Sequence, residues 1–210
     1  GLANPKSVRN AAFISFAIAA LAGLILSART SWFLLIIGAL AILAAWTYTG
    51  GPRPYGYSGL GEISVFLFFG LIATMGTYYV QVQHLSNSVF LASMSMGSFA
   101  CAILVLNNLR DRERDDQSGK RTLAVTLGDV STRNLYRWLI FASLAIVAPL
   151  TFFSPYFLLP LTLLPIAARL VRQVRSGAKN FDLVPLLAST GRLQIQYALL
   201  LSLAAVLAAR

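Results

Sequence analysis

The sequence predicts an all-α fold, a polytopic transmembrane helical bundle, and three observations support this prediction. Of the 210 residues, 57% are hydrophobic and only 11% are charged, whereas soluble domains carry roughly 25% charged residues. The mean hydropathy is +0.71. Apolar runs long enough to cross a bilayer recur along the chain. A soluble domain is excluded, because so few charged side chains cannot cover its surface.

Seven apolar runs are expected to cross the membrane, each as a helix, because lipid offers no hydrogen-bond partner to a free backbone amide. In chain order they are residues 11–27, 32–48, 60–82, 88–108, 138–153, 156–171 and 193–209. Several lie near the lower limit of about 17 residues for a spanning helix. No soluble segment separates them, so residues 1–210 are expected to form a single transmembrane domain.

The distribution of charge predicts how the bundle is oriented. One side of the membrane is expected to hold segments 1–10, 49–59, 109–137 and 172–192. With the adjoining helix ends, this side carries fifteen of the 17 basic residues and all seven acidic ones, and the other side carries only Arg29 and Arg210. The positive-inside rule therefore places the charged side in the cytoplasm, which fits the cytoplasmic membrane of a bacterium.

Several classes of partner and site are excluded by composition. The net charge of +10 does not indicate a nucleic-acid partner, because the basic residues lie between apolar runs. A single cysteine, Cys101, excludes a disulfide framework and a cysteine-rich metal site. A single histidine, His84, excludes any site that needs two.

The segment richest in chemistry is NNLRDRERDDQSGKRT at residues 107–122, which leaves the fourth apolar run directly. Asn107, Asp111 and Asp115 are four residues apart, so they share one face if the helix continues. Two carboxylates one turn apart can hold Mg²⁺, which commonly bridges carboxylates to a substrate phosphate. Lys120 and Arg121 follow and can neutralise phosphate oxygens. The segment therefore indicates a lipid diphosphate substrate.

An ordinary solvated loop is the alternative for this segment, because cytoplasmic loops are charged by default and mixed-sign runs are usually exposed faces. The position of Asn107 argues against that alternative. It begins the motif while still at the end of an apolar run, and polar residues placed there usually serve a pathway or a site.

A second segment, WTYTGGPRPYGYSGLGE at residues 46–62, is dense in glycine, proline and tyrosine. Its glycines and prolines predict a non-helical path between the second and third spans. Tyr48 and its neighbouring tyrosines can stabilise a cation, and Arg53 can bind an anion. The functional interpretation is a cap over the site. The alternative is a turn with an interfacial belt of aromatic residues.

Weaker patterns in the remaining spans are interpreted structurally. Small side chains in the fourth span are expected to form a helix-packing face: Ser93, Ser95, Gly97 and Ser98. Arginines near the end of the sixth span recur every three residues and are expected to reach anionic headgroups, with phosphate capture as the alternative: Arg169, Arg172 and Arg175. Gln194 and Gln196 are expected to hydrogen-bond between helices or to line a cavity.

The chain resembles the intramembrane aromatic prenyltransferases of quinone biosynthesis. The resemblance is carried by YTGGPRPYGYSGLGEISVFLFFG at residues 48–70 and NNLRDRERDDQSGKRTLAVTLG at residues 107–128, in matching order and spacing. It implies transfer of a polyprenyl group from polyprenyl diphosphate to an aromatic ring, with Mg²⁺ as the cofactor. The first phrase favours the branch whose acceptor is 1,4-dihydroxy-2-naphthoate, which loses carbon dioxide on the way to menaquinone.

The resemblance also implies roles for particular residues. Asp111 and Asp115 match the second of the family's two Asp-rich motifs and are the implied metal ligands, with Asn107 on the same face. Lys120 and Arg121 fall in the basic segment that binds the diphosphate. Tyr48 and Arg53 match the loop that covers the first motif.

The chain departs from the family pattern at its start. The family has nine helices, and its first Asp-rich motif, an Asn/Asp pattern with spacings of four, has no counterpart here. Seven visible spans and two earlier helices would make nine, so we expect the sequence to lack an N-terminal part.

Two alternatives to the naphthoate enzyme stay open. The first is a sibling prenyltransferase that acts on 4-hydroxybenzoate, homogentisate or a porphyrin precursor. The second is a non-catalytic bundle or transporter, which is disfavoured because transporters usually place acids or broken helices at mid-membrane and no acid lies at mid-span here.

Overall fold

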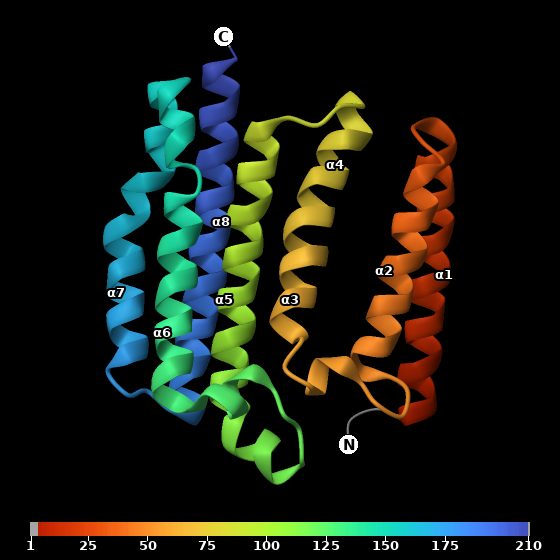
Figure 1. The fold of residues 1–210 in the computed structure, drawn as a ribbon, viewed down its shortest axis with the longest axis vertical. Helices are drawn as coiled ribbons and strands as arrows, with labels where there is room; N and C mark the ends of the chain where they lie inside the picture. Colours follow the sequence, from red (N-terminus) through yellow and green to blue (C-terminus); the bar gives the residue numbers. More distant parts are fainter. Residues whose placement is uncertain (1–3, 210) are drawn as a thin grey trace. The chain divides into compact units, whose positions relative to one another are not determined.

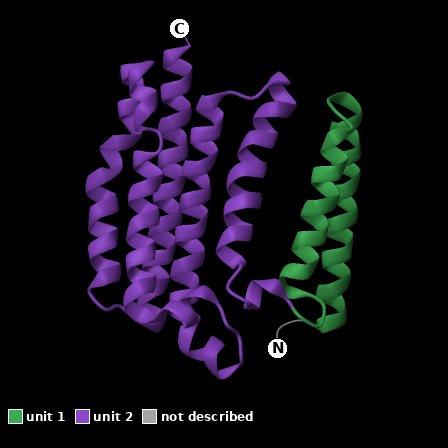
Figure 2. Ribbon diagram, viewed as in Figure 1, with its two compact units in different colours: residues 1–53 green, residues 54–210 purple. Residues whose placement is uncertain are grey.

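A computed structural model describes residues 4–209, and all regular elements among them are helices. Two compact units are present, residues 1–53 and residues 54–210 (Figure 2). Each unit is described by itself. Gly1 and Arg210, which the sequence assigns to opposite sides of the membrane, lie outside the described residues.

The first unit is a pair of helices, α1 (Pro5–Arg29) and α2 (Phe33–Thr49). Asn4 caps α1, since its side-chain oxygen accepts from the backbone amide of Lys6 at 2.9 Å, and Pro5 suits the first turn. The rings of Phe13 and Trp46 stack between the two helices with centroids 5.3 Å apart. This cap starts α1 six residues before the apolar run 11–27 that was expected to form it.

The second unit begins with a short 3₁₀ turn and a segmented rod, and then runs through four longer helical segments. The first elements are η1 (Tyr55–Tyr57), α3 (Gly61–Val65), the π-helical η2 (Phe66–Ile72) and α4 (Ala73–Val82). The later elements are α5 (Asn87–Gln117), α6 (Leu123–Ala145), η3 (Ala148–Phe152), η4 (Pro155–Leu163), α7 (Leu164–Arg175), η5 (Asn180–Asp182) and α8 (Leu183–Ala208).

Each of the seven predicted spans coincides with a helical segment, so the all-α polytopic prediction is confirmed. Within residues 4–209, six segments are long and apolar enough to cross a membrane, and Phe33–Thr49 is a seventh, shorter apolar helix. The segments 109–137 and 172–192, which the sequence places between spans, are largely helical. Helix α5 continues to Gln117 and α6 already begins at Leu123. Hydropathy marks where a helix meets lipid, and a helix can continue past that boundary into water.

The core of the second unit is centred on α5, which packs against η2, α6 and α8. The predicted packing face of α5 is confirmed, because Ser93, Ser95, Gly97 and Ser98 are all buried. Ser95 Oγ donates to the backbone oxygen of Ser143 at 2.5 Å and lies 2.7 Å from the hydroxyl of Tyr197. These bonds link α5, α6 and α8 through polar groups that would otherwise be buried without partners.

The charged connections of the second unit gather at one end. In Figure 1 the links 58–60, 118–122 and 176–179 lie at the lower end, and the link between α4 and α5 lies at the upper end. This end holds the C-terminus of α5 with most of the acidic residues. The predicted segregation of charge is therefore present within this unit.

Candidate active site

The last three turns of α5 carry the predicted acidic face. Asn107, Asp111 and Asp115 all lie on this one continuous helix, so the spacing of four places them on the same side of it. The helix ends when the amide of Ser118 donates to the oxygen of Arg114, and Gly119 then turns the chain with φ of +77°. A glycine suits this position because positive φ strains other residues.

Asp111 is engaged by its neighbour Arg110. The guanidinium donates through Nε and Nη2 to the two carboxylate oxygens, at 2.9 and 2.6 Å. This fork is the strongest geometry for an arginine–carboxylate pair. The side chain of Asp111 stays 22% exposed, so one edge of the carboxylate remains accessible.

Asp115 is the more buried carboxylate, with 9% of its side chain exposed. Lys120 folds back onto it. The amide of Lys120 donates to the backbone oxygen of Asp115 at 2.9 Å, and Nζ lies 3.4 Å from its carboxylate. Arg121 lies 3.8 Å from Asp116 with both side chains mostly exposed, which makes that pair weak. The predicted diphosphate ligand Lys120 is thus beside the acidic face in this structure.

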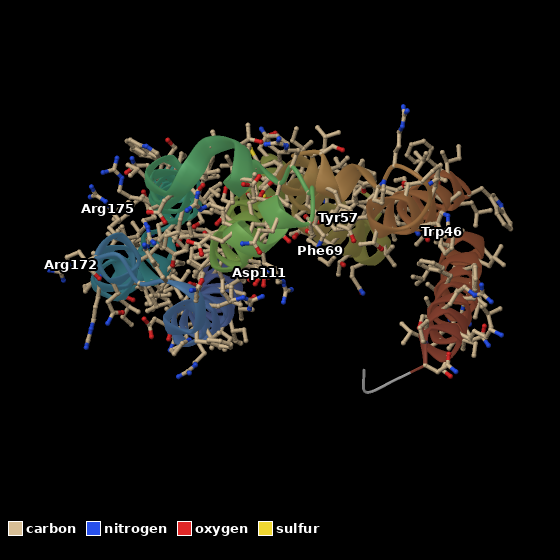
Figure 3. The ribbon with its side chains drawn as sticks, turned by 90° about the horizontal axis from the view of Figure 1, so that it is seen from below. Trp46, Tyr57, Phe69, Asp111, Arg172 and Arg175 are labelled. Carbon is tan, nitrogen blue, oxygen red and sulfur yellow. The ribbon has the colours of Figure 1, made fainter. Side chains whose placement is uncertain are left out.

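The glycine- and tyrosine-rich loop before α3 contacts this turn. Tyr57 accepts from the amide of Arg121 at 2.8 Å through its backbone oxygen, and Lys120 Nζ lies 4.6 Å from the centre of the Tyr57 ring. A Cβ on Gly59 would come within 3.5 Å of the backbone oxygen of Arg121, so the two loops approach closely. Figure 3 views this end from below and labels Tyr57 and Asp111. The loop covers the turn after α5, and the ring of Tyr57 contacts the ammonium group of Lys120.

Sequence reasoning missed the contact between α3 and α5. Asn108 donates to Glu62 Oε1 at 3.0 Å, and the other oxygen, Oε2, is buried without a hydrogen-bond partner among residues 4–209. Glu62 itself is 8% exposed. The signal in the sequence was a lone acid at the start of an apolar run, and its partner 46 residues later could not be inferred from spacing.

Tyr48 and Arg53 belong to the first unit. Tyr48 lies in the last turn of α2, and Arg53 is in the loop that follows. Their predicted action on the acidic face of α5, which belongs to the second unit, stays a prediction.

Comparison with known proteins identifies the family. The sequence profile described as "UbiA prenyltransferase family" matches residues 2–182. The chain belongs to the UbiA prenyltransferase family. The relatives include proteins named 1,4-dihydroxy-2-naphthoate octaprenyltransferase. The one from Mycobacterium tuberculosis is 41% identical over 198 residues, which are 94% of this chain and 68% of the relative.

Other relatives extend the comparison. The Mycobacterium leprae protein of the same name is 41% identical over 207 residues, which are 99% of this chain and 70% of that protein. A chicken protein named UbiA prenyltransferase domain-containing protein 1 is 37% identical over 143 residues, covering 68% of this chain and 42% of that protein. Membership of a prenyltransferase family supports an enzyme and leaves the transporter alternative without support.

The acidic face of α5 offers carboxylates that suit a divalent cation. Among residues 4–209, no group of three or more His, Cys, Asp or Glu side chains is arranged so that it could hold a metal ion. Asp111 and Asp115 offer two carboxylates on one face. Mg²⁺ is commonly bound by one or two carboxylates, substrate phosphates and waters rather than by an all-protein cage. The pair therefore fits an ion held jointly with a phosphate substrate.

Proposed function

We propose that this protein transfers a polyprenyl group from polyprenyl diphosphate to 1,4-dihydroxy-2-naphthoate. The observation that carries the proposal is the paired carboxylates Asp111 and Asp115, with Lys120 beside them, at the charged end of a membrane helix bundle. The choice of acceptor rests on relatives that bear this name at 41% identity. A prenyltransferase for 4-hydroxybenzoate or homogentisate is the alternative within the same chemistry.

The acidic end of α5 is proposed to bind the diphosphate. Asp111 and Asp115 would hold Mg²⁺, and the ion supplies positive charge to the departing diphosphate. Asn107 extends the same face by one turn and can donate or accept a hydrogen bond there. Lys120 and Arg121 are proposed to bind phosphate oxygens. Both side chains already lie near the carboxylates of α5, because the turn at Gly119 folds them back toward the end of that helix.

The covering loop is proposed to exclude water. Ionisation breaks the bond between the allylic carbon and its diphosphate oxygen, and the cation that forms must not meet water. Tyr57 is held against the turn by its backbone bond to Arg121. From the first unit, Tyr48 and Arg53 are proposed to complete the cap, as the resemblance implies. The electron-rich naphthoate ring then forms the new carbon–carbon bond, and its carboxylate leaves as carbon dioxide.

The charged end is proposed to face the cytoplasm in the cytoplasmic membrane of a bacterium. All seven acidic residues and fifteen of the 17 basic ones are assigned to that side, and the bias in basic residues sets topology. Water-soluble diphosphate can then leave directly into the cytoplasm, and the polyprenyl chain stays in lipid.

The test is prenyl transfer in membranes of cells that express the protein, with product followed by mass spectrometry. We expect Asp111→Asn and Asp115→Asn each to lower turnover by at least about 100-fold, as the loss of one preorganised electrostatic group often does. Asp116→Asn is the matched control, because its carboxylate is 62% exposed and only weakly paired. Chelation should abolish transfer and Mg²⁺ should restore it. Near-normal turnover of both variants would refute the site, and faster transfer to 4-hydroxybenzoate would refute the acceptor.

A further inference from the structure

A polar groove lies between α7 and α8, and none of its lining residues belongs to α5. It has a volume of about 350 Å³. Its lining includes two arginines, two glutamines and a serine beside an apolar wall: Arg169, Gln173 and Leu170 from α7, with Ser189, Arg192 and Gln196 from α8.

Helical periodicity explains why these side chains meet. The polar lining residues of α7, Arg169 and Gln173, are four residues apart, and those of α8 are three and four residues apart, so each set forms one face. The opposite face of α7 is fixed in the core through Ala167, Val171 and Val174, which are buried. The polar face therefore cannot rotate inward and stays presented at the groove.

The groove carries positive charge that no carboxylate of the described residues neutralises. The ion pairs among residues 4–209 involve Arg110, Lys120, Arg121 and Arg133, and no carboxylate lies within 4.0 Å of Arg169 or Arg192. The remaining polar side chains add amide and hydroxyl donors to the two guanidiniums. A site of this composition favours an anion with several acceptor oxygens.

The depth of the two arginines identifies where that anion lies. Arg169 is six residues before the end of α7, and Arg192 is nine residues after the start of α8. At 1.5 Å per residue both lie about 9–14 Å from the charged ends of their helices. Charged side chains at the edge of the hydrocarbon are costly unless they reach headgroups or a partner, so a membrane-bound anion is the natural occupant.

We propose that the α7–α8 groove binds the phosphate group of an anionic phospholipid. The two guanidiniums and the amides bind phosphate oxygens, and the exposed side chain of Ile166 in the lining contacts the start of an acyl chain. Basic pockets between transmembrane helices on the cytoplasmic side are typical headgroup sites. The sequence expectation treated Arg169, Arg172 and Arg175 alike. The structure separates them, because only Arg169 lines the groove, while Figure 3 shows Arg172 and Arg175 at the outer edge of the view.

The experiment measures lipid binding by the purified protein in detergent, with native mass spectrometry and thermal unfolding as readouts. Phosphatidylglycerol should bind and raise Tm, and phosphatidylcholine should do neither at equal concentration. We expect Arg169→Gln with Arg192→Gln to weaken phosphatidylglycerol binding at least tenfold. The matched control is Arg172→Gln with Arg175→Gln, which removes the same charge from the same end and should bind like the unchanged protein.

Three outcomes would overturn the proposal. The first is equal loss of lipid in both double variants, which indicates non-specific attraction. The second is unchanged binding in the groove variant. The third is a Tm increase with inorganic diphosphate or phosphate that matches the lipid effect, which indicates a site for soluble phosphate. If the glutamine variant does not fold, Arg192→Lys keeps the charge but loses the two-pronged donor, and we expect it to weaken lipid binding without lowering Tm in lipid-free detergent.

Discussion

Replacing Arg133 by methionine should destabilise the second unit more than any other single loss of charge at its lower end. The guanidinium of Arg133 is buried, with its side chain 6% exposed. It donates to both carboxylate oxygens of Asp129, at 2.7 and 2.9 Å, to the backbone oxygen of Val174, and to that of Ala178 at 2.8 Å. One side chain thus joins α6, the end of α7 and the link that follows.

The size of the effect follows from these partners. The backbone oxygens of Val174 and Ala178 lose a charged donor. Each loss lowers the free energy of unfolding by about 1 kcal/mol, because water can reach part of this helix end. Breaking a buried ion pair costs about 3–5 kcal/mol, but Asp129 is 36% exposed and can be resolvated, which reduces that part to about 1 kcal/mol. We expect Arg133→Met to lower the free energy of unfolding by about 3 kcal/mol in total, roughly 100-fold in the folded-to-unfolded ratio.

The assay is reversible unfolding by sodium dodecyl sulfate in mixed micelles, followed by circular dichroism. Arg137→Met is the matched control, one turn along α6, where the guanidinium lies 4.8 Å from the Trp138 ring and makes no ion pair among the described residues. Adding Asp129→Asn to Arg133→Met should recover about 1 kcal/mol, because no unpaired carboxylate remains. If Arg133→Met lowers the free energy of unfolding no more than the control does, the claim that Arg133 holds the end of α7 to α6 is refuted.

Two other substitutions test contacts of α5. Glu62→Leu removes the acceptor of Asn108 and should lower the free energy of unfolding by about 1–3 kcal/mol. Glu62→Gln keeps an acceptor and should be close to neutral in the same unfolding assay. Equal losses in the two variants would contradict the role of that hydrogen bond. Gly97→Val should cost at least about 1–3 kcal/mol through overpacking, because an added Cβ would lie 2.9 Å from the ring of Phe66 and 3.2 Å from the Cα of Gly70. Gly76→Ala, with open space around it, should be tolerated. A stable Gly97→Val protein would show that the helices can separate.

The fold was predictable because lipid restricts the backbone so strongly. A long apolar run has few options other than a helix, and the run 32–48 accordingly lies within one residue of the observed Phe33–Thr49 at each end. The helix ends were harder to predict where polar sequence follows. The stretch that leads α6 from Leu123 to its apolar part is charged in places, yet Arg133 and Tyr136 within it are buried. Its burial comes from packing with α5 and α7, which hydropathy along the chain does not report.

The acidic face was predictable for a similar reason. Its three residues lie on one element, so spacing alone relates Asn107 to Asp115. The partners of that face come from elsewhere and needed the fold. Tyr57 meets Lys120 only because two loops approach, and Glu62 meets Asn108 only because α3 packs on α5. Tyr48 and Arg53 belong to the first unit, so their relation to this face depends on how the two units are arranged.

The ion pairs at the acidic face bear on how a diphosphate would bind. Two carboxylates one turn apart repel each other, and Arg110 and Lys120 cancel that repulsion in this structure. Both cations can also donate to the oxygens of a bound diphosphate. A diphosphate that draws them away leaves Asp111 and Asp115 without counterions, and a divalent cation restores the balance. The face is therefore suited to bind metal and diphosphate together, and each should bind weakly without the other.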